Sequence, residues 1–313
     1  MSSVCVVGAG AWGTALAVHA ARLGHDVALW ARRPERLGRE NPRLPGVLLP
    51  AAVRVVGAPS AADYVLVTVP MQHLRAVLLA LRPVGPLVLC CKGLETDTGL
   101  LPLEVAAQVL PGVSACVLTG PNFAHEIAAG LPAAAVVAGG DAGLRAALLD
   151  LLAGPTFRLY GNEDAVGAQL GGAAKNVFAI AAGAVTGAGL GENARAALIT
   201  RGLAEMARLA VALGGRAETV SGLSGLGDLM LSCGSRTSRN FTLGFSLGQD
   251  VALADLLPPD GPVVEGVATA PAILARAGNL DLPVIRAVAD LLVGRVTLLD
   301  TIGRLLARKL KDE

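Results

Sequence analysis

Two lysines are unusual because this chain carries almost all of its positive charge on arginine. Its 26 basic residues comprise 22 Arg and four Lys. Lys309 and Lys311 lie in the polar C-terminal tail, whereas Lys92 and Lys175 are set in apolar sequence. Charged side chains are rarely buried without a partner. Lys92 and Lys175 are therefore the first candidates for chemistry.

Lys175 lies in "GGAAKNVFAIAAG", residues 171–183, which contains no other charge. Burial in such surroundings disfavours the charged form and would lower the pKa of the amine from its reference of about 10.4. Such an amine transfers protons near neutral pH, whereas arginine stays protonated. The alternatives are that Lys175 extends to solvent or pairs with an acid. We expect a proton-transfer role.

Lys92 lies in "CCKGLE", residues 90–95, directly after an apolar run that reads as a buried strand. An ordinary strand-end lysine that reaches solvent is the alternative. Ligands of open α/β sheets bind where the strands end. The place of Lys92 beside a glycine at that edge favours a ligand contact.

Asp228 lies among glycines in "SGLSGLGDLMLSC", residues 221–233. We expect it on a flexible turn just before an apolar helix, where it completes a site. The alternative is an aspartate that caps the N-terminus of that helix, which is a common use of this residue type.

A cluster of hydroxyl, guanidinium and amide groups follows in "SRTSRN", residues 235–240, which includes Ser238, Arg239 and Asn240. These groups suit a phosphate or a phosphorylated small molecule. Taken alone, the stretch is also compatible with a solvated loop.

The N-terminal stretch "VCVVGAGAWG" contains Gly8, Gly10 and Gly13 in the pattern GxGxxG, between an apparent strand and a helix. In this context the pattern is a dinucleotide fingerprint. Gly8 permits a tight turn, Gly10 lets the backbone approach a pyrophosphate, and Gly13 lets the helix pack on the strand. The N-terminus of the helix supplies free N–H groups for the phosphates.

The end of the second expected strand bears on which dinucleotide is bound. NAD-binding proteins usually place an acid there. Here the sequence is Trp30–Ala31–Arg32–Arg33, with no acid before Glu35. Two guanidiniums suit a 2′-phosphate, or one stacks on the adenine. We favour NADP(H), with NAD(H) also possible; surface arginines without a ligand are the alternative.

The first half alternates apolar runs with helical patterns, which indicates a parallel sheet covered on both faces. The expected strands are Val4–Val7, Asp26–Trp30, Tyr64–Val69, Leu87–Cys91, Ala115–Leu118 and Ala133–Ala138. The expected helices include 12–23, 100–110, 163–190, 194–213, 264–277, 283–293 and 297–308. Residues 31–60 read as an irregular surface excursion. The prediction is an α/β Rossmann-type domain, residues 1–162, followed by an all-helical domain, residues 163–313.

Composition narrows the function classes. The net charge is +1 and only 3% of residues are aromatic, which argues against a nucleic-acid surface. The five cysteines show no metal-ligand spacing and read as structural thiols of a reducing compartment. The longest apolar run is interrupted by Lys175, Asn176 and glycines, so we expect no stable membrane insertion. A cytoplasmic protein is expected, and the apolar helical half is compatible with a homodimer.

Taken together, the motifs resemble the bacterial-type NAD(P)-dependent glycerol-3-phosphate dehydrogenases along nearly the whole chain. They are "GAGAWGTALA", "VPMQHLR", "CCKGLE", "TGPNFAHEIAAGLPAA", "GGAAKNVFAIAAG", "SGLSGLGDLMLSC", "SRN" followed by "FTLG", and "VVEGVATA". The resemblance implies reduction of dihydroxyacetone phosphate to sn-glycerol 3-phosphate, a precursor of phospholipids.

The resemblance also implies residue roles. Lys175 would be the general acid for the carbonyl, and Lys92 would contact both substrate and cofactor. Residues implied to line the substrate are Gly120, Asn122, Asp228, Ser238, Arg239 and Asn240. Residues implied to border the dinucleotide are Ala11, Trp12, Arg32, Arg33, Ala124, Arg239, Val263 and Glu265.

Two departures from the family pattern affect these roles. Asn122 stands where the family often has Ser or Thr, and the loop at 34–46 is short. Two other functions remain open at this point. One is a related helical-domain reductase of another small keto or hydroxy substrate, similar to 3-hydroxyisobutyrate dehydrogenases. The other is a non-catalytic NADP(H)-binding sensor.

Overall fold

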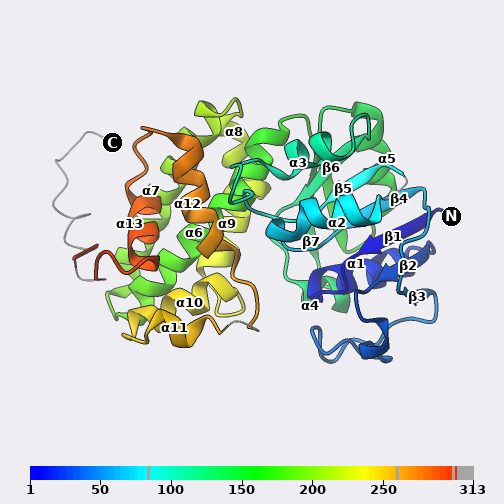
Figure 1. Ribbon diagram of the computed structural model, residues 1–313, viewed down its shortest axis with the longest axis horizontal. Coiled ribbons are helices and arrows are strands. Elements are labelled where there is room, and N and C mark those ends of the chain that lie inside the picture. The colour runs from blue at the N-terminus through cyan, green and yellow to red at the C-terminus, as the bar shows by residue number, and fades with distance from the viewer. Residues whose placement is uncertain (83–84, 259–260, 298–299, 302–313) are drawn as a thin grey trace.

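A twisted sheet with helices on both faces forms the first half of the computed structural model, and helices alone form the second half (Figure 1). The structure describes residues 1–82, 85–258, 261–297 and 300–301. Its eight strands lie in the order β3-β2-β1-β4-β5-β6-β7-β8. They are β1 Ser3–Val7, β2 Asp26–Trp30, β3 Val53–Val56, β4 Tyr64–Val67, β5 Leu87–Leu89, β6 Ala115–Thr119, β7 Ala133–Ala138 and β8 Phe157–Asn162.

The sheet is parallel except between β6 and β7, which pair antiparallel. The expectation of a wholly parallel sheet is therefore wrong at one pair, since an apolar run does not encode the direction of its strand. Two strands were not expected from the sequence. Segment 31–60 contains β3, a short strand that pairs with β2, and residues 157–162 form β8 beside β7. Neither has the continuous apolar run of a doubly covered strand, because both lie at a sheet edge.

Alternate residues of the strands reach opposite layers of helices. Val4 and Val6 of β1 pack in one core cluster with α1, α4 and α5, whereas Cys5 and Val7 pack in another with α2 and α3. This alternation follows from the two-residue period of a strand. The helices of this half are α1 Ala11–Arg22, α2 Leu74–Leu81, α3 Pro102–Val109, α4 Ala124–Ala129 and α5 Ala142–Leu152, with short 3₁₀ turns η1 Pro34–Arg36 and η2 Met71–His73.

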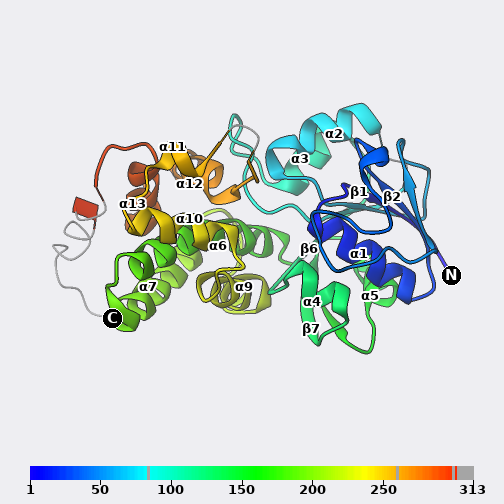
Figure 2. The same cartoon turned by 90° about the horizontal axis from the view of Figure 1, so that it is seen from below.

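The long helix α6 runs through the centre of the helical half (Figure 2). Its glycines allow direct backbone contact with α10. A Cβ at Gly183 would lie 2.1 Å from the Phe241 carbonyl oxygen, and one at Gly187 would lie 2.0 Å from that of Phe245. The elements of this half are α6 Ala165–Gly187, α7 Gly191–Ala212, α8 Ala217–Val220, the π-helical turn η3 Leu223–Gly227, α9 Asp228–Cys233, α10 Arg239–Gly248, α11 Leu253–Leu256, α12 Glu265–Ala277 and α13 Pro283–Leu292.

The helical half contains three α-helices that were not expected, namely the short helices α8 and α11 and the longer α10. Helix α10 begins inside a Gly- and Ser-rich passage and was not expected, since Ser238 provides its N-terminal cap in sequence that otherwise reads as loop. Most of the helix expected at 297–308 lies outside the described residues. Within the described ranges, no helix combines the length and hydropathy needed to cross a bilayer.

Candidate functional site

One buried carboxylate joins the two lysines that the sequence singled out. Asp228 is the first residue of α9 and is 1% exposed. Lys175 on α6 donates from Nζ to Oδ1 of Asp228 at 2.8 Å, and Lys92, which follows β5, donates to Oδ2. Asp228 does not lie on a flexible turn as expected, because η3 runs directly into α9 and buries it. Asp228 therefore compensates charge from both halves of the molecule.

Each ammonium group keeps one donor for a ligand. Lys175 also donates to Oγ of Ser232 at 2.7 Å, and Lys92 also donates to the carbonyl oxygen of Gly120 at 3.1 Å. Because an ammonium has three N–H donors, each lysine has one left after these contacts. Two cations and one carboxylate leave a net positive charge, which suits an oxygen that becomes negative during a reaction.

The charged groups in this cluster change one another's pKa values. Burial alone would raise the pKa of Asp228, but the ammonium groups of Lys175 and Lys92 outweigh it and lower that pKa. Burial, together with the positive charge of Lys175, lowers the pKa of Lys92, although Asp228 opposes the shift. Of the alternatives for Lys175, the structure shows pairing with an acid, and this partner comes from α9, 53 residues along the chain.

A glycine of α6 gives the site its close packing. A Cβ at Gly172 would lie 2.9 Å from Oγ1 of Thr119 and 3.5 Å from the Lys92 side chain. The Thr119 hydroxyl is buried without a hydrogen-bond partner among the described residues, and so is Oδ1 of Asn122. Asn122 is fixed by its Nδ2, which donates to the Ala134 carbonyl at 3.0 Å. Because buried polar atoms are normally paired, these two oxygens indicate contacts that a ligand supplies.

The Ser-Arg-Asn motif lies at the N-terminus of α10. Ser238 caps the helix, where its Oγ accepts from the Phe241 N–H at 3.4 Å. Asn240 donates to Oδ1 of Asn176 at 2.9 Å and accepts from the Gly266 N–H at 2.9 Å, so it connects α6 to α12. Ser238 keeps its hydroxyl proton and Asn240 one amide N–H. Arg239 is the exposed residue of the three.

The glycines of the β1–α1 turn have the geometry that a dinucleotide requires. Gly8 has φ +117°, and a Cβ at Gly13 would lie 1.9 Å from the Gly8 carbonyl oxygen. Gly10 precedes α1 with no side-chain cap, and a Cβ there would meet nothing within 4 Å. The first N–H groups of α1 are therefore free to bind phosphate. Ala11 and Trp12 form the start of that helix.

Glu265, at the start of α12, has another buried oxygen without a hydrogen-bond partner among the described residues. Oε1 of Glu265 accepts from the Met71 N–H at 3.2 Å, whereas Oε2 is buried without a partner among the described residues. Burial raises the pKa of Glu265 to about 6, against the opposing effects of the Met71 N–H and the charge of Arg239. Val263, 39% exposed, lies just before this helix.

The remaining predicted positions lie at the ends of β2 and β6. Arg32 and Arg33 follow β2 and are both exposed, and Ala124 is the first residue of α4. The structure thus brings Lys92, Gly120, Lys175 and Asp228 into direct contact. No hydrogen bond or ion pair described for the structure links Arg32 or Arg33 to this cluster.

Sequence reasoning missed Ser232, although it lies inside a quoted motif. Ser232 is four residues after Asp228, and residues at this spacing share a face of a helix. Had Asp228 been placed inside the helix rather than on the preceding turn, this spacing would have identified Ser232 as a neighbour.

The strand order, the Gly-rich turn and the helical second half are those of a Rossmann-type dinucleotide-binding protein. Residues 3–144 match the family described as NAD-dependent glycerol-3-phosphate dehydrogenase N-terminus, and residues 164–302 match the corresponding C-terminus. The chain belongs to the NAD(P)-dependent glycerol-3-phosphate dehydrogenase family.

Individual relatives align along nearly the whole chain. A glycerol-3-phosphate dehydrogenase (NAD(P)+) of Acidiphilium cryptum is 55% identical over 318 residues, covering 98% of this chain and 97% of that protein. One from Gluconobacter oxydans is 51% identical over 297 residues, covering 92% of each. The crystal structure of glycerol-3-phosphate dehydrogenase from Coxiella burnetii is 34% identical, with a TM-score of 0.91 over 98% of this chain and 99% of that one.

Proposed function

We propose that this protein interconverts dihydroxyacetone phosphate and sn-glycerol 3-phosphate with NAD(P)H, and thereby supplies glycerol phosphate for phospholipid synthesis. The observation that carries the proposal is the cluster of Lys92, Asp228 and Lys175, in a chain whose two halves match the two domains of this dehydrogenase family. We place the division between the dinucleotide-binding and catalytic domains at residues 162 and 163.

The lysine cluster suits reduction of a carbonyl. The remaining donor of Lys175 hydrogen-bonds the carbonyl oxygen and transfers its proton as that oxygen becomes an alkoxide. Lys92 stabilises the developing negative charge. Asp228 and Ser232 hold the Lys175 amine in place at 2.8 and 2.7 Å. In the reverse direction Lys175 accepts the proton of the alcohol.

The substrate phosphate is assigned to the N-terminus of α10. Arg239 presents an exposed guanidinium, while Ser238 and Asn240 retain one donor each. The helix N-terminus adds a favourable dipole for an anion. Gly120 and the orphaned oxygen of Asn122 complete the substrate side, with Oδ1 available to accept from a substrate hydroxyl.

The dinucleotide fits the residues that surround its proposed position. The free N–H groups at the start of α1 would hold its pyrophosphate, and Oε2 of Glu265, which lacks a partner among the described residues, would accept from an N–H or O–H group of the dinucleotide. When bound, the nicotinamide supplies the hydride for the carbonyl carbon. The exposed guanidiniums of Arg32 and Arg33 after β2 support a preference for NADP(H) over NAD(H).

The proposal also covers the location and the assembly of the protein. All five cysteines are free, which supports a reducing compartment such as the cytoplasm. The apolar composition of the helical half is the basis for proposing a homodimer formed by that half. Sedimentation of the purified protein measures its mass in solution.

The decisive experiment is an assay of NADPH oxidation with the purified protein. We expect turnover with dihydroxyacetone phosphate and little with unphosphorylated dihydroxyacetone or without substrate. Equal rates with both ketones would indicate a reductase that does not select for phosphate. NADPH binding without oxidation of any substrate would indicate a sensor.

A further inference from the structure

The segment 92–101 belongs to the sheet half by connectivity but packs in the core of the helical half. It joins β5 to α3 and begins with Lys92. Leu94 and Leu101 are 0% and 1% exposed and belong to the core cluster of the helical half. Gly93, with φ +142°, lies so close to α12 that a Cβ there would be 3.1 Å from Oγ1 of Thr269. The position of Lys92 therefore depends on how α12 docks.

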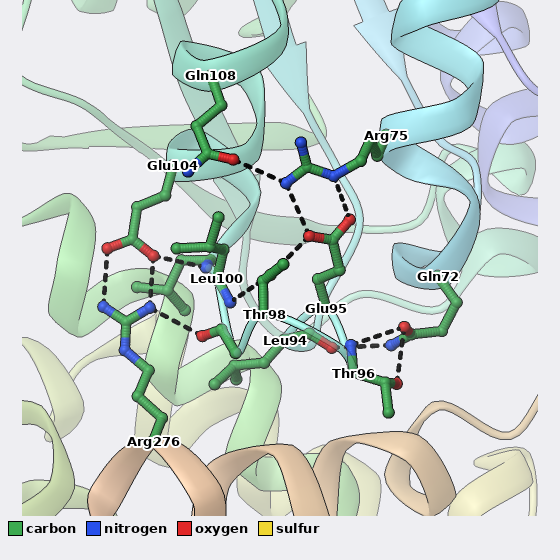
Figure 3. A network of polar contacts seen from close by, with 12 residues as sticks. Gln72, Arg75, Leu94, Glu95, Thr96, Thr98, Leu100, Glu104, Gln108 and Arg276 are labelled. Atoms are coloured by element: carbon green, nitrogen blue, oxygen red, sulfur yellow. Dashed lines mark hydrogen bonds and ion pairs between the residues drawn. The ribbon is translucent and has the colours of Figure 1, made fainter.

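Arg276, near the C-terminal end of α12, fastens this segment with a forked contact (Figure 3). Its Nη1 and Nη2 donate to the two carboxylate oxygens of Glu104 at 2.5 and 2.7 Å, and Nη1 also donates to the Gly99 carbonyl at 2.8 Å. Glu104 in turn accepts from the Leu101 N–H at 2.7 Å, at the start of α3. Paired charged hydrogen bonds of this kind fix geometry as well as adding stability.

The other side of the same segment is held by residues of its own half. Arg75 on α2 makes two hydrogen bonds of 2.8 Å to Glu95, and Gln72 donates to the Leu94 carbonyl at 2.8 Å (Figure 3). The segment is therefore held between α2 and α12. Two of the ion pairs described for this segment and the start of α3 cross between the two halves, namely that of Lys92 with Asp228 and that of Arg276 with Glu104, whereas that of Arg75 with Glu95 does not.

The same helix also connects to the second lysine. Helix α12 packs on α6, which carries Lys175, and the Gly266 N–H at its start is bonded to Asn240, which is itself bonded to Asn176 beside Lys175. Arg276 thus belongs to a continuous set of contacts that runs from the segment of Lys92 to the helix of Lys175. A shift of the segment along α12 would move one ammonium relative to the other.

Resting on the reductase activity proposed above, we infer that Arg276 is a positioning residue for the reaction. It holds segment 92–101 against α12, and so fixes the Lys92 ammonium at Asp228 and opposite Lys175. Its described hydrogen bonds go to Gly99 and Glu104, neither of which is proposed to bind substrate or cofactor. Its loss should slow the chemical step and leave the dinucleotide turn of β1 and α1 unchanged.

The test compares Arg276→Ala, Arg276→Lys and Glu104→Gln with the intact enzyme. We expect Arg276→Ala to lower kcat at least tenfold while the Kd for NADPH, measured by fluorescence titration, changes less than twofold. Lysine restores one donor without the fork, so Arg276→Lys should recover part of kcat. Glu104→Gln removes the same ion pair by changing its acidic partner. It replaces Arg276→Ala in the test if Arg276→Ala does not fold. The control is Arg54→Ala, which deletes an ion pair at the sheet edge in which Nη2 donates to both carboxylate oxygens of Asp26.

A double-mutant cycle with Lys92→Ala separates positioning from general stability. If Arg276 acts through Lys92, Arg276→Ala should lower kcat less than twofold further in the Lys92→Ala background. An equal fold loss in both backgrounds, or a kcat within twofold of the intact enzyme in Arg276→Ala, would overturn the inference. Failure of the proposed function is recognised separately, because the intact enzyme would then not oxidise NADPH with dihydroxyacetone phosphate.

Discussion

Lys92 and Lys175 hold opposite oxygens of one carboxylate, although they come from different halves of the molecule. Nζ of Lys175 lies 2.8 Å from Oδ1 of Asp228, and Lys92 donates to Oδ2 of the same side chain. The carboxylate offsets the repulsion between two cations that would otherwise be buried side by side. The way in which the two halves dock therefore also sets the position of one ammonium group relative to the other.

Replacing Lys175 with methionine should abolish turnover and spare dinucleotide binding. Methionine keeps the apolar stem and removes the proton donor, and general acid–base groups typically contribute 10²–10⁴-fold. Turnover is measured by NADPH oxidation, and binding by NADPH fluorescence. Lys175→Arg is the matched control, because it keeps the charge but does not release a proton. A variant that retains more than about a tenth of the normal kcat would contradict the acid role.

Replacing Asp228 with asparagine should reduce both stability and activity. The neutral amide leaves two lysines without a compensating charge, and breaking a buried ion pair from one side typically costs about 3–5 kcal/mol. Urea unfolding measures the loss, with the exposed Asp97→Asn as control. Similar unfolding free energies for the two variants would show that Asp228 does not balance the lysines.

The double variant Arg32→Ala/Arg33→Ala should weaken NADPH binding far more than NADH binding. The two guanidiniums are proposed to contact the 2′-phosphate, which NADH lacks. Titration with each cofactor gives the two changes in Kd. Arg36→Ala/Arg39→Ala removes two exposed arginines from the same segment and should change neither. An equal loss for both cofactors would remove the basis for the NADP(H) preference.

Because buried Glu205 stays protonated to a higher pH in the folded state than in the unfolded state, the protein should become less stable as the pH rises from about 4.5 to 7. Burial raises the pKa of Glu205 to about 7, although the Val284 and Ile285 N–H groups oppose it. The folded state then binds more protons than the unfolded state in this window, so the unfolding free energy falls with pH. At about 1.4 kcal/mol per pKa unit, the fall is at most about 3 kcal/mol.

Glu205→Gln does not titrate and still has one oxygen to accept from the Val284 N–H, which now lies 2.7 Å from Glu205 Oε1. The unfolding free energy of Glu205→Gln, measured in urea at pH 5 to 8, should increase relative to that of the intact protein as the pH rises. The exposed Glu218→Gln is the control. Parallel pH profiles for Glu205→Gln and the intact protein would refute the assignment.

Local patterns were sufficient to predict the dinucleotide turn, most strands and the helical second half. The direction of β7 and the edge strands β3 and β8 were not predictable in this way, because direction and edge position depend on neighbours that a short run does not specify. The site shows the same limit. Lys175 looked isolated because its own helix has no acid, and the residue that pairs with it lies on α9.

The contact of Arg276 with Glu104 was beyond sequence reasoning for a similar reason. The two residues are 172 positions apart, and each alone is an ordinary charge on a helix. The role of Ser232 could have been predicted from the sequence, since its spacing from Asp228 on one helix places both residues beside the Lys175 amine. Residue types can therefore indicate a contact when the two partners lie within a few helical turns of each other. They do not indicate it when tertiary folding brings distant partners together.

The burial of Leu94 and Leu101 in the core of the helical half also bears on how the chain matures. These side chains are made early, yet their hydrophobic surroundings are completed only after α12 has been synthesised. Until then Leu94 and Leu101, which flank the start and the end of the segment that begins with Lys92, lack these partners. The hydrophobic surroundings of segment 92–101 are therefore complete only when the chain has been synthesised through α12.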